Sequence, residues 1–132
     1  DAAIMCAAVA DYRPQNYTDK KIKREAGDMQ LTLVPNPDIA AALGKIKQPG
    51  QLLVGFALET DNEEQNAVSK MRRKNLDFIV LNSLQEPGAG FRCDTNRITI
   101  IEQNGVKQLF DLKSKRDVAN DIVGKIIEKF NL

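Results

Sequence analysis

Three short apolar runs, separated by segments of helical periodicity, dominate the first two thirds of the chain. The runs span residues 3–10, 51–58 and 76–83 and are rich in small or branched side chains. Between them, residues 36–47 ("NPDIAAALGKIK") and 63–75 ("EEQNAVSKMRRKN") repeat apolar positions at helical spacing. This order of strand, helix, strand, helix and strand predicts a parallel sheet with right-handed crossovers, and we expect its first strand to be covered on both faces.

The last third of the chain has a different pattern. Residues 96–103 ("NRITIIEQ") and 106–112 ("VKQLFDL") alternate apolar and polar positions around Asn104-Gly105, which predicts a β-hairpin. Ser114 then begins a final helix with Asp117 at its third position, and its apolar face consists of Val118, Ile122, Ile126 and Phe130. The predicted fold class is α/β: a Rossmann-like, mainly parallel sheet with flanking helices and a C-terminal hairpin and helix.

A basic segment interrupts this pattern after the first run. Residues 12–20 predict a loop, and residues 20–25 and 29–34 predict two extended segments joined at Ala26-Gly27-Asp28, an exposed hairpin or flap. Its cations, with one before it, are Arg13, Lys20, Lys21, Lys23 and Arg24. Most such charge runs are solvated surfaces, and the alternative here is a triphosphate ligand.

Composition indicates one ordinary domain over residues 1–132, because a chain with 42% hydrophobic residues can bury one core. The 19 basic and 18 acidic residues leave a charge of +1, so we expect neither a nucleic-acid nor a membrane partner. Cys6 and Cys93 have neither disulfide nor metal-ligand spacing, which fits a reducing cytoplasm. We expect no targeting leader, and the strand that begins at once after Asp1 suggests the C-terminal part of a longer protein.

The absence of histidine excludes several mechanisms. A Ser-His-Asp triad, a Cys-His pair and an HExxH zinc site all need an imidazole. The sequence also contains no GxxxxGK[ST] or GxGxxG phosphate loop and no nucleophile elbow. Any chemistry must therefore depend on lysine, aspartate, asparagine and backbone groups.

Ligands of an α/β sheet bind beyond the carboxyl ends of its strands, where loops and helix N-termini meet. Four places follow from this rule. They are Asp11 with its basic loop, Asn36-Pro37-Asp38, Glu59-Thr60-Asp61, and Asn82 with the loop to Phe91.

Each candidate side chain also has an ordinary structural role. Asp11 can form a turn or hydrogen-bond to the sugar or base of a ligand. Lys70 and Lys74 share one side of a helix and can be surface lysines or, with Arg72 and Arg73, a cationic wall. Phe56 can fill the core or, beside Gly55, stack near a ligand. Gly88 and Gly90 could wrap an anion, although glycine-rich turns are common.

Six motifs, in their order and spacing, closely resemble the bacterial phosphopantothenoylcysteine synthetase domain of coenzyme A biosynthesis. They are "AAVADYRP", "DKKIKRE", "VPNPDI", "VGFALET", "KNLDFIVLNS" and "GAGFRCDTN", and they span nearly the whole chain. The resemblance implies a ligase that uses CTP to activate 4'-phosphopantothenate as an acyl cytidylate, which the amine of cysteine then attacks. In this family the domain often follows a flavin-dependent decarboxylase.

The resemblance also assigns roles to residues. Asp11 and Lys21 match the nucleotide-contacting aspartate and the essential lysine, and Lys21 would stabilise charge at the activated carboxyl. Further nucleotide-site positions are Ala7, Asn36, Pro37, Asp38, Ile39, Phe56, Lys70 and Lys74. The resemblance implies Mg²⁺ with CTP, although the sequence offers no clear set of carboxylate ligands. It also implies a homodimer in which the flap and neighbouring strands meet across the interface.

The sequence departs from the family pattern in one respect. The family has a further N-terminal segment, with a glycine-rich phosphate loop and a substrate-contacting asparagine, that does not occur in these residues. This chain alone would then lack part of the site. Two other function classes stay open: a non-catalytic nucleotide-binding or regulatory domain of the same fold, and a dinucleotide-dependent oxidoreductase, which the missing glycine fingerprint disfavours.

Overall fold

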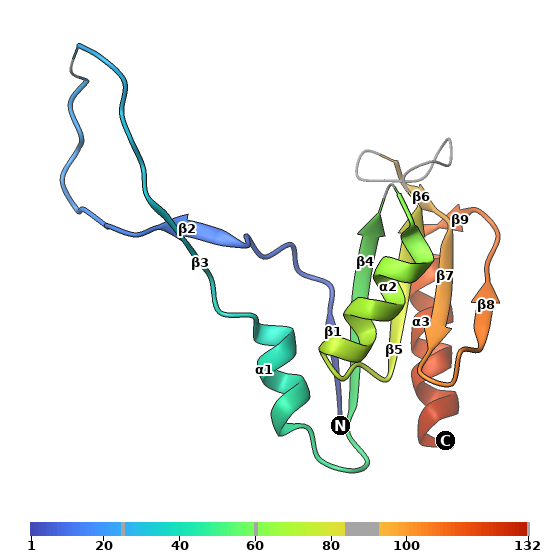
Figure 1. Ribbon diagram of the computed structural model, residues 1–132. Coiled ribbons are helices and arrows are strands. Elements are labelled where there is room, and N and C mark those ends of the chain that lie inside the picture. The colour runs from blue at the N-terminus through green and yellow to red at the C-terminus, as the bar shows by residue number, and fades with distance from the viewer. Residues whose placement is uncertain (25, 60, 84–92, 132) are drawn as a thin grey trace. The chain divides into compact units, whose positions relative to one another are not determined.

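The computed structural model describes residues 1–24, 26–59, 61–83 and 93–131, and the chain forms two compact units. The sheet unit comprises Asp1–Cys6 and Ile39–Leu132, and the ribbon unit comprises Ala7–Asp38 (Figure 1). No helix among the described residues combines the length and apolar character needed to cross a membrane.

A five-stranded sheet forms the centre of the sheet unit, in the order β1-β4-β5-β7-β8. Its strands are β1 (Ala2–Met5), β4 (Leu52–Glu59), β5 (Phe78–Ser83), β7 (Ile98–Glu102) and β8 (Lys107–Leu109). β1, β4 and β5 run parallel, β7 is antiparallel to β5, and β8 is antiparallel to β7. The predicted α/β class, with its parallel core and C-terminal hairpin, is confirmed.

Helices lie on both faces of this sheet (Figure 1). α1 (Ile39–Ile46) and α2 (Glu63–Arg73) lie on one face, where Leu43, Ala67 and Met71 pack in a cluster with residues of β4, β5 and β7. α3 (Lys115–Phe130) covers the other face through Val118 and Ile122. Beside the start of α3, β6 (Thr95–Asn96) and β9 (Lys113–Ser114) form a separate two-stranded ladder.

Two residues that the sequence predicts at the ends of elements, Ser114 and Gly105, have the expected roles. Ser114 caps α3, because its hydroxyl oxygen accepts a hydrogen bond from the backbone N–H of Asp117 at 3.1 Å. Gly105 has a φ of 86° at the turn between β7 and β8, a conformation that glycine adopts without strain. The Glu102 N–H bonds to the Val106 carbonyl at 3.0 Å and closes this hairpin.

The first strand is shorter and more exposed than predicted. β1 ends at Met5, and the Cys6 N–H turns back to bond the Ile4 carbonyl at 3.1 Å. Ala3 and Met5 pack against the α1–α2 side, whereas Ala2 and Ile4 are exposed. The expectation of a strand covered on both faces is therefore wrong, because the α3-side cluster reaches β4, β5 and β7 but contains no residue of this edge strand.

The ribbon unit pairs at its base rather than along the predicted flap. β2 (Tyr12–Pro14), in the expected loop, is antiparallel to β3 (Leu33–Pro35), and the Gln15 N–H bonds to the Thr32 carbonyl at 2.8 Å. Residues 20–24 and 26–32 form no strand. Ile22, Met29 and Leu31 are each 60% exposed, and a two-stranded ribbon without a covered face is marginally stable in water.

Close packing at Gly44 joins α1 to the end of α2. A Cβ at this position would stand 2.0 Å from the backbone oxygen of Lys74. The side-chain amide of Asn75 bonds to the Gly44 carbonyl at 2.8 Å, and the Lys47 ammonium bonds to both carboxylate oxygens of Asp77 at 2.9 Å. Only glycine allows this approach, so α1 is held at one fixed place on the sheet unit.

Replacing Gly44 with alanine should lower the free energy of unfolding by about 3 kcal/mol, because a backbone oxygen cannot move aside as a side chain would. Gly124→Ala is the matched control, since a Cβ there meets nothing within 4 Å in the middle of α3. The control should stabilise the protein by about 0.5–1 kcal/mol. Urea-induced unfolding measures both values, and equal effects of the two substitutions would contradict the packing described for α1.

A buried ion cluster fastens α3 to the end of β7. The Glu102 carboxylate bonds to the Lys125 ammonium at 2.6 Å and also to Lys129, and Lys125 bonds to Glu128 at 2.9 Å. Burial of Glu102 favours its neutral form, but the hydrogen bonds and charges of both lysines outweigh this effect and lower its pKa. The hydrogen bond to Glu102, followed by that to Glu128, raises the pKa of Lys125.

Because the Glu102 pKa is lower in the folded than in the unfolded state, its contribution to stability is complete above pH 4.5 and is lost as the pH falls through the folded-state pKa. Glu102→Gln should cost about 3 kcal/mol at pH 7, since the buried Lys125 then loses its buried carboxylate partner and keeps only the exposed Glu128. The difference in unfolding free energy between wild type and variant should shrink as the pH falls below about 4. A pH-independent difference in urea titrations would contradict this account.

Candidate functional site

The carboxyl end of β1 is where the sheet unit presents a candidate cation. On the neighbouring strand β4, the Leu52 N–H bonds to the Asp1 carbonyl at 3.0 Å. Every second residue of β4 from Leu52 onward, including Phe56, therefore directs its backbone N–H and carbonyl toward β1. The β1–β4 register ends at Met5 opposite Gly55. The next carbonyl, that of Phe56, accepts a hydrogen bond from the Lys70 ammonium at 2.8 Å. Lys70 therefore lies where the first ladder stops.

Two other predicted residues of the sheet unit lie near Lys70 in the structure. The Phe56 side chain is half-buried and packs against the α3-side cluster, and its role at a nucleotide site stays a prediction. Lys74 ends α2, and its N–H bonds to the carbonyls of Arg72 and Lys70. The helix thus fixes the backbone of both lysines.

The ribbon unit brings Asp11 and Asn36 together. The Asn36 N–H bonds to the Asp11 carbonyl at 2.8 Å and extends the β2–β3 ladder by one residue. The side-chain amide of Asn36 donates to the Ala10 carbonyl at 2.7 Å, and its oxygen accepts from Arg13 Nη1 at 3.1 Å. Arg13 Nη1 also donates to the Pro35 carbonyl at 3.0 Å. These bonds close the base of the ribbon.

The same bonds correct the predicted start of α1. The helix begins at Ile39 and not at Asn36, because the backbone and side chain of Asn36 are engaged with the opposite strand. The following Pro37 also disfavours a helical conformation at Asn36. Pro37 and Asp38 connect the two units, and Ile39, whose side chain is 48% exposed, is the first residue of the helix.

Two predicted residues of the ribbon unit, Ala7 and Lys21, are exposed. Ala7 follows the end of β1 by two residues, so it is not part of the strand itself. Lys21 is exposed in the part of the ribbon that forms no strand. That Lys21 and Asp11 share one pocket with the lysines of α2 stays a prediction.

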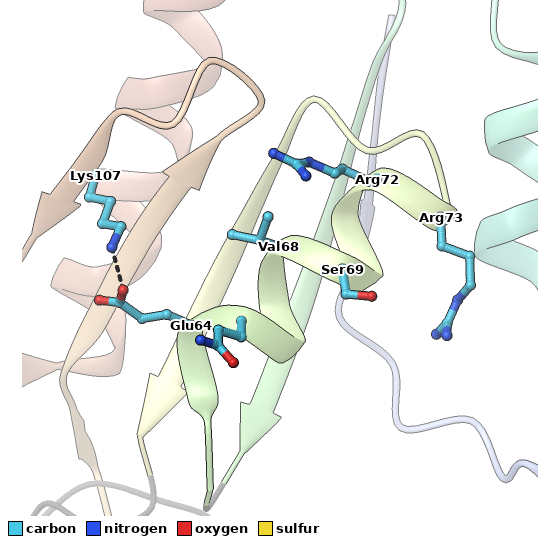
Figure 2. Close-up of a pocket in the computed structure, with 7 residues that line it drawn as sticks. Glu64, Val68, Ser69, Arg72, Arg73 and Lys107 are labelled. Atoms are coloured by element: carbon cyan, nitrogen blue, oxygen red, sulfur yellow. Dashed lines mark hydrogen bonds and ion pairs between the residues drawn. The ribbon is translucent and has the colours of Figure 1, made fainter.

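The four cations near the end of α2 do not form a single wall. Arg72 and Arg73 line an open hollow of about 610 Å³ on the outer side of α2, where they project in different directions (Figure 2). Lys70 and Lys74 are not among the residues that line it. The cation that β8 contributes there, Lys107, is paired with Glu64 (Figure 2). The hollow therefore contains a mixed-charge surface.

Asparagines mark the carboxyl end of β5. The Asn82 side-chain oxygen accepts a hydrogen bond from Asn96 Nδ2 at 3.0 Å, and the Asn96 oxygen accepts from the Arg97 N–H at 3.0 Å. This polar pair lies at the carboxyl end of β5, and that Asn82 faces a ligand there stays a prediction. Thr60 and the glycine-rich stretch with Gly88 and Gly90 lie outside the described residues.

The arrangement favours binding of anions over metal chemistry. Among the residues the structure describes, no three side chains of Asp, Glu, Cys or His gather as a metal site would need. Cations instead occur at both candidate places, Lys70 beside β4 and Arg13 at the base of the ribbon. Such groups can position phosphates and stabilise developing negative charge.

Arg13 is the residue that the sequence interpretation named but did not assign to the site. Its signal was its position between Asp11 and Pro14, where an extended backbone is favoured because a residue before proline avoids the helical region. The bond from Arg13 to Asn36 joins residues 23 positions apart in the chain, a contact that no local pattern reveals.

Residues 1–130 match the family described as the DNA/pantothenate metabolism flavoprotein C-terminal domain. A prokaryotic protein named cysteine/cysteine sulfinic acid decarboxylase is 60% identical over 96% of the chain and 35% of its own length. The coenzyme A biosynthesis bifunctional protein CoaBC of Haemophilus influenzae is 42% identical over 96% of the chain and 31% of its own length.

The fold agrees with these matches. The crystal structure of the C-terminal domain of a coenzyme A biosynthesis bifunctional protein CoaBC superposes with a TM-score of 0.76 and 35% identity. The match covers 99% of this chain and 57% of the solved one. The chain thus spans about a third of the length of the curated relatives and a little over half of the solved domain.

The closed base of the ribbon can be tested without any ligand. Asn36→Ala removes the bonds to Ala10 and Arg13, so the amide protons of residues 36 and 15 should exchange with solvent about tenfold faster. Asn16→Ala, an equal truncation of an exposed asparagine in the same unit, should leave both rates unchanged. Hydrogen exchange followed by mass spectrometry or NMR gives the rates, and unaltered protection in Asn36→Ala would refute the described closure.

Proposed function

The chain belongs to the DNA/pantothenate metabolism flavoprotein C-terminal domain family, and from this membership we propose that it is the ligase part of an enzyme of coenzyme A biosynthesis. The proposed reaction joins 4'-phosphopantothenate to L-cysteine at the expense of CTP. The family match over residues 1–130 is the observation that carries the proposal. The six ordered motifs of the sequence and the likeness to the CoaBC C-terminal domain support it.

The proposed chemistry has two steps. An oxygen of the phosphopantothenate carboxylate attacks the α-phosphorus of CTP, which forms an acyl cytidylate and releases pyrophosphate. The amine of cysteine then attacks the acyl carbon, loses a proton, and expels CMP to leave an amide. Both steps need positioned charge and exclusion of water more than a protein nucleophile, so a protein without histidine can perform them.

The proposed roles follow the charges of the two units. Asp11 accepts hydrogen bonds from the nucleotide, and Lys21 binds phosphate and stabilises the negative charge at the activated carboxyl. Lys70 and Lys74 contribute further positive charge, and the bond from Lys70 to the Phe56 carbonyl supports its placement at a strand end where ligands of α/β proteins bind. An exposed, basic ribbon can approach a bound anhydride and keep water from it.

Magnesium enters this proposal only with its nucleotide. The described side chains contain no carboxylate cluster that fits a protein-bound Mg²⁺, and Mg²⁺ commonly binds through substrate phosphates and water. We therefore treat Mg²⁺–CTP as the form of the substrate and assign no step to a resident metal. A homodimer with ribbon contacts across the interface and a cytoplasmic location complete the proposal.

A second candidate deserves comparison because one relative is named a decarboxylase. This chain matches only 35% of that protein. The name therefore describes the whole relative, of which the matched part is about a third. A decarboxylase could then contain this domain without using it for decarboxylation. In that case the domain would be a non-catalytic nucleotide-binding or regulatory module of the same fold.

Turnover by the full-length protein separates these candidates. With CTP, phosphopantothenate and cysteine, the ligase should release CMP and pyrophosphate in equal amounts, whereas a regulatory module should consume no CTP. Lys21→Gln should still bind CTP but lose at least about 100-fold in amide formation, as expected when a charge-stabilising donor is removed. Near-normal turnover of this variant would remove Lys21 from the mechanism, and Lys45→Gln, on exposed α1 surface, is the control.

A further inference from the structure

Arg13 differs from the paired lysines of this protein in what holds it. Lys47, Lys107, Lys113, Lys125 and Lys129 each lie within ion-pair distance of a carboxylate. Arg13 instead donates to two neutral oxygens, the carbonyl of Pro35 and the side-chain amide oxygen of Asn36. In the described part of the chain, no carboxylate forms an ion pair with it. Its positive charge is therefore fixed in place but not neutralised.

The free edge of this guanidinium is suited to an anion. An arginine side chain has five N–H donors in a rigid fork, and the two bonds described here use only Nη1. The three donors on Nη2 and Nε remain, and Arg13 is exposed to solvent. Because the existing bonds already restrict the side chain, a phosphate would bind with little further loss of conformational freedom.

The surroundings of Arg13 indicate what kind of anion fits. Asp11 stands two residues earlier, directly before β2, and offers a hydrogen-bond acceptor where Arg13 offers donors. A nucleotide carries matching groups, because its ribose hydroxyls donate and its phosphates accept.

We propose that Arg13 is a phosphate-binding residue that takes a β- or γ-phosphate oxygen of the nucleotide on its free Nη2–Nε edge, while Nη1 stays bonded to Pro35 and Asn36. The proposal rests on the proposed function for the identity of the nucleotide. The site itself depends only on the ribbon unit. Asn36 then acts by orienting Arg13, since its side-chain oxygen is already occupied by that bond.

Calorimetric titration of the full-length protein tests this with three probes: CTP, cytidine and inorganic pyrophosphate. Arg13→Ala should weaken binding of CTP and of pyrophosphate about tenfold or more, as expected for a charge-assisted hydrogen bond, and leave cytidine within about twofold. Arg13→Lys should fall between, because an ammonium keeps the charge but not the fork. Lys45→Ala removes one exposed positive charge from α1 and should change every affinity less than about threefold.

Several results would overturn the proposal. Unchanged CTP and pyrophosphate binding in Arg13→Ala would do so, as would absence of pyrophosphate binding by the wild type. Equal weakening of cytidine and CTP would show that Arg13 merely shapes the nucleoside pocket. If hydrogen exchange shows that Arg13→Ala loosens the ribbon, the CTP and pyrophosphate affinities of Arg13→Lys are used to test the proposal instead. A wild type that binds pyrophosphate through Arg13 but never turns over CTP would refute the ligase and leave this site standing.

Discussion

The point at which the β1–β4 ladder stops is the constraint on which the sheet unit's part of the site depends. Parallel pairing ends after Met5, and the next carbonyl of β4, that of Phe56, is free to accept the Lys70 ammonium. Had β1 continued as the apolar run suggested, a backbone N–H would have taken that carbonyl. Because the chain turns away at Cys6, no β1 residue pairs with the Phe56 carbonyl, and the Lys70 ammonium bonds to it instead.

The scaffold and the candidate site use charge in opposite ways. Where charges support the fold, they are neutralised: Lys125 and Glu102 are buried together, and Lys47 is bonded to Asp77. At the base of the ribbon, Arg13 is oriented by neutral oxygens and retains its charge. A cation that is already held in place loses less side-chain entropy when it binds a phosphate than a free lysine would.

The sequence was sufficient for elements whose signals are local. The period of the apolar residues predicted α2, β4 and β5, the Asn104-Gly105 turn predicted the last hairpin, and Ser114 predicted the start of α3. Predictions failed where a contact between distant residues decides the structure. Asn36 opens a segment of helical periodicity, yet its bonds to residues 10, 11 and 13 hold it against the opposite strand at the end of the β2–β3 ladder. The strands of the ribbon could not be predicted from local pattern either, because only residues 12–14 and 33–35 at its base pair with each other.

We propose that this protein forms the amide through an acyl cytidylate and that positioned cations stabilise the negative charge that develops in the reaction. Exchange of labelled pyrophosphate into CTP, measured on the full-length protein, tests that intermediate directly. The account predicts exchange that requires phosphopantothenate and proceeds without cysteine, because activation is reversible before the amine attacks. Amide formation from the three substrates with no exchange under any condition would contradict the acyl cytidylate, and the absence of both would contradict the ligase.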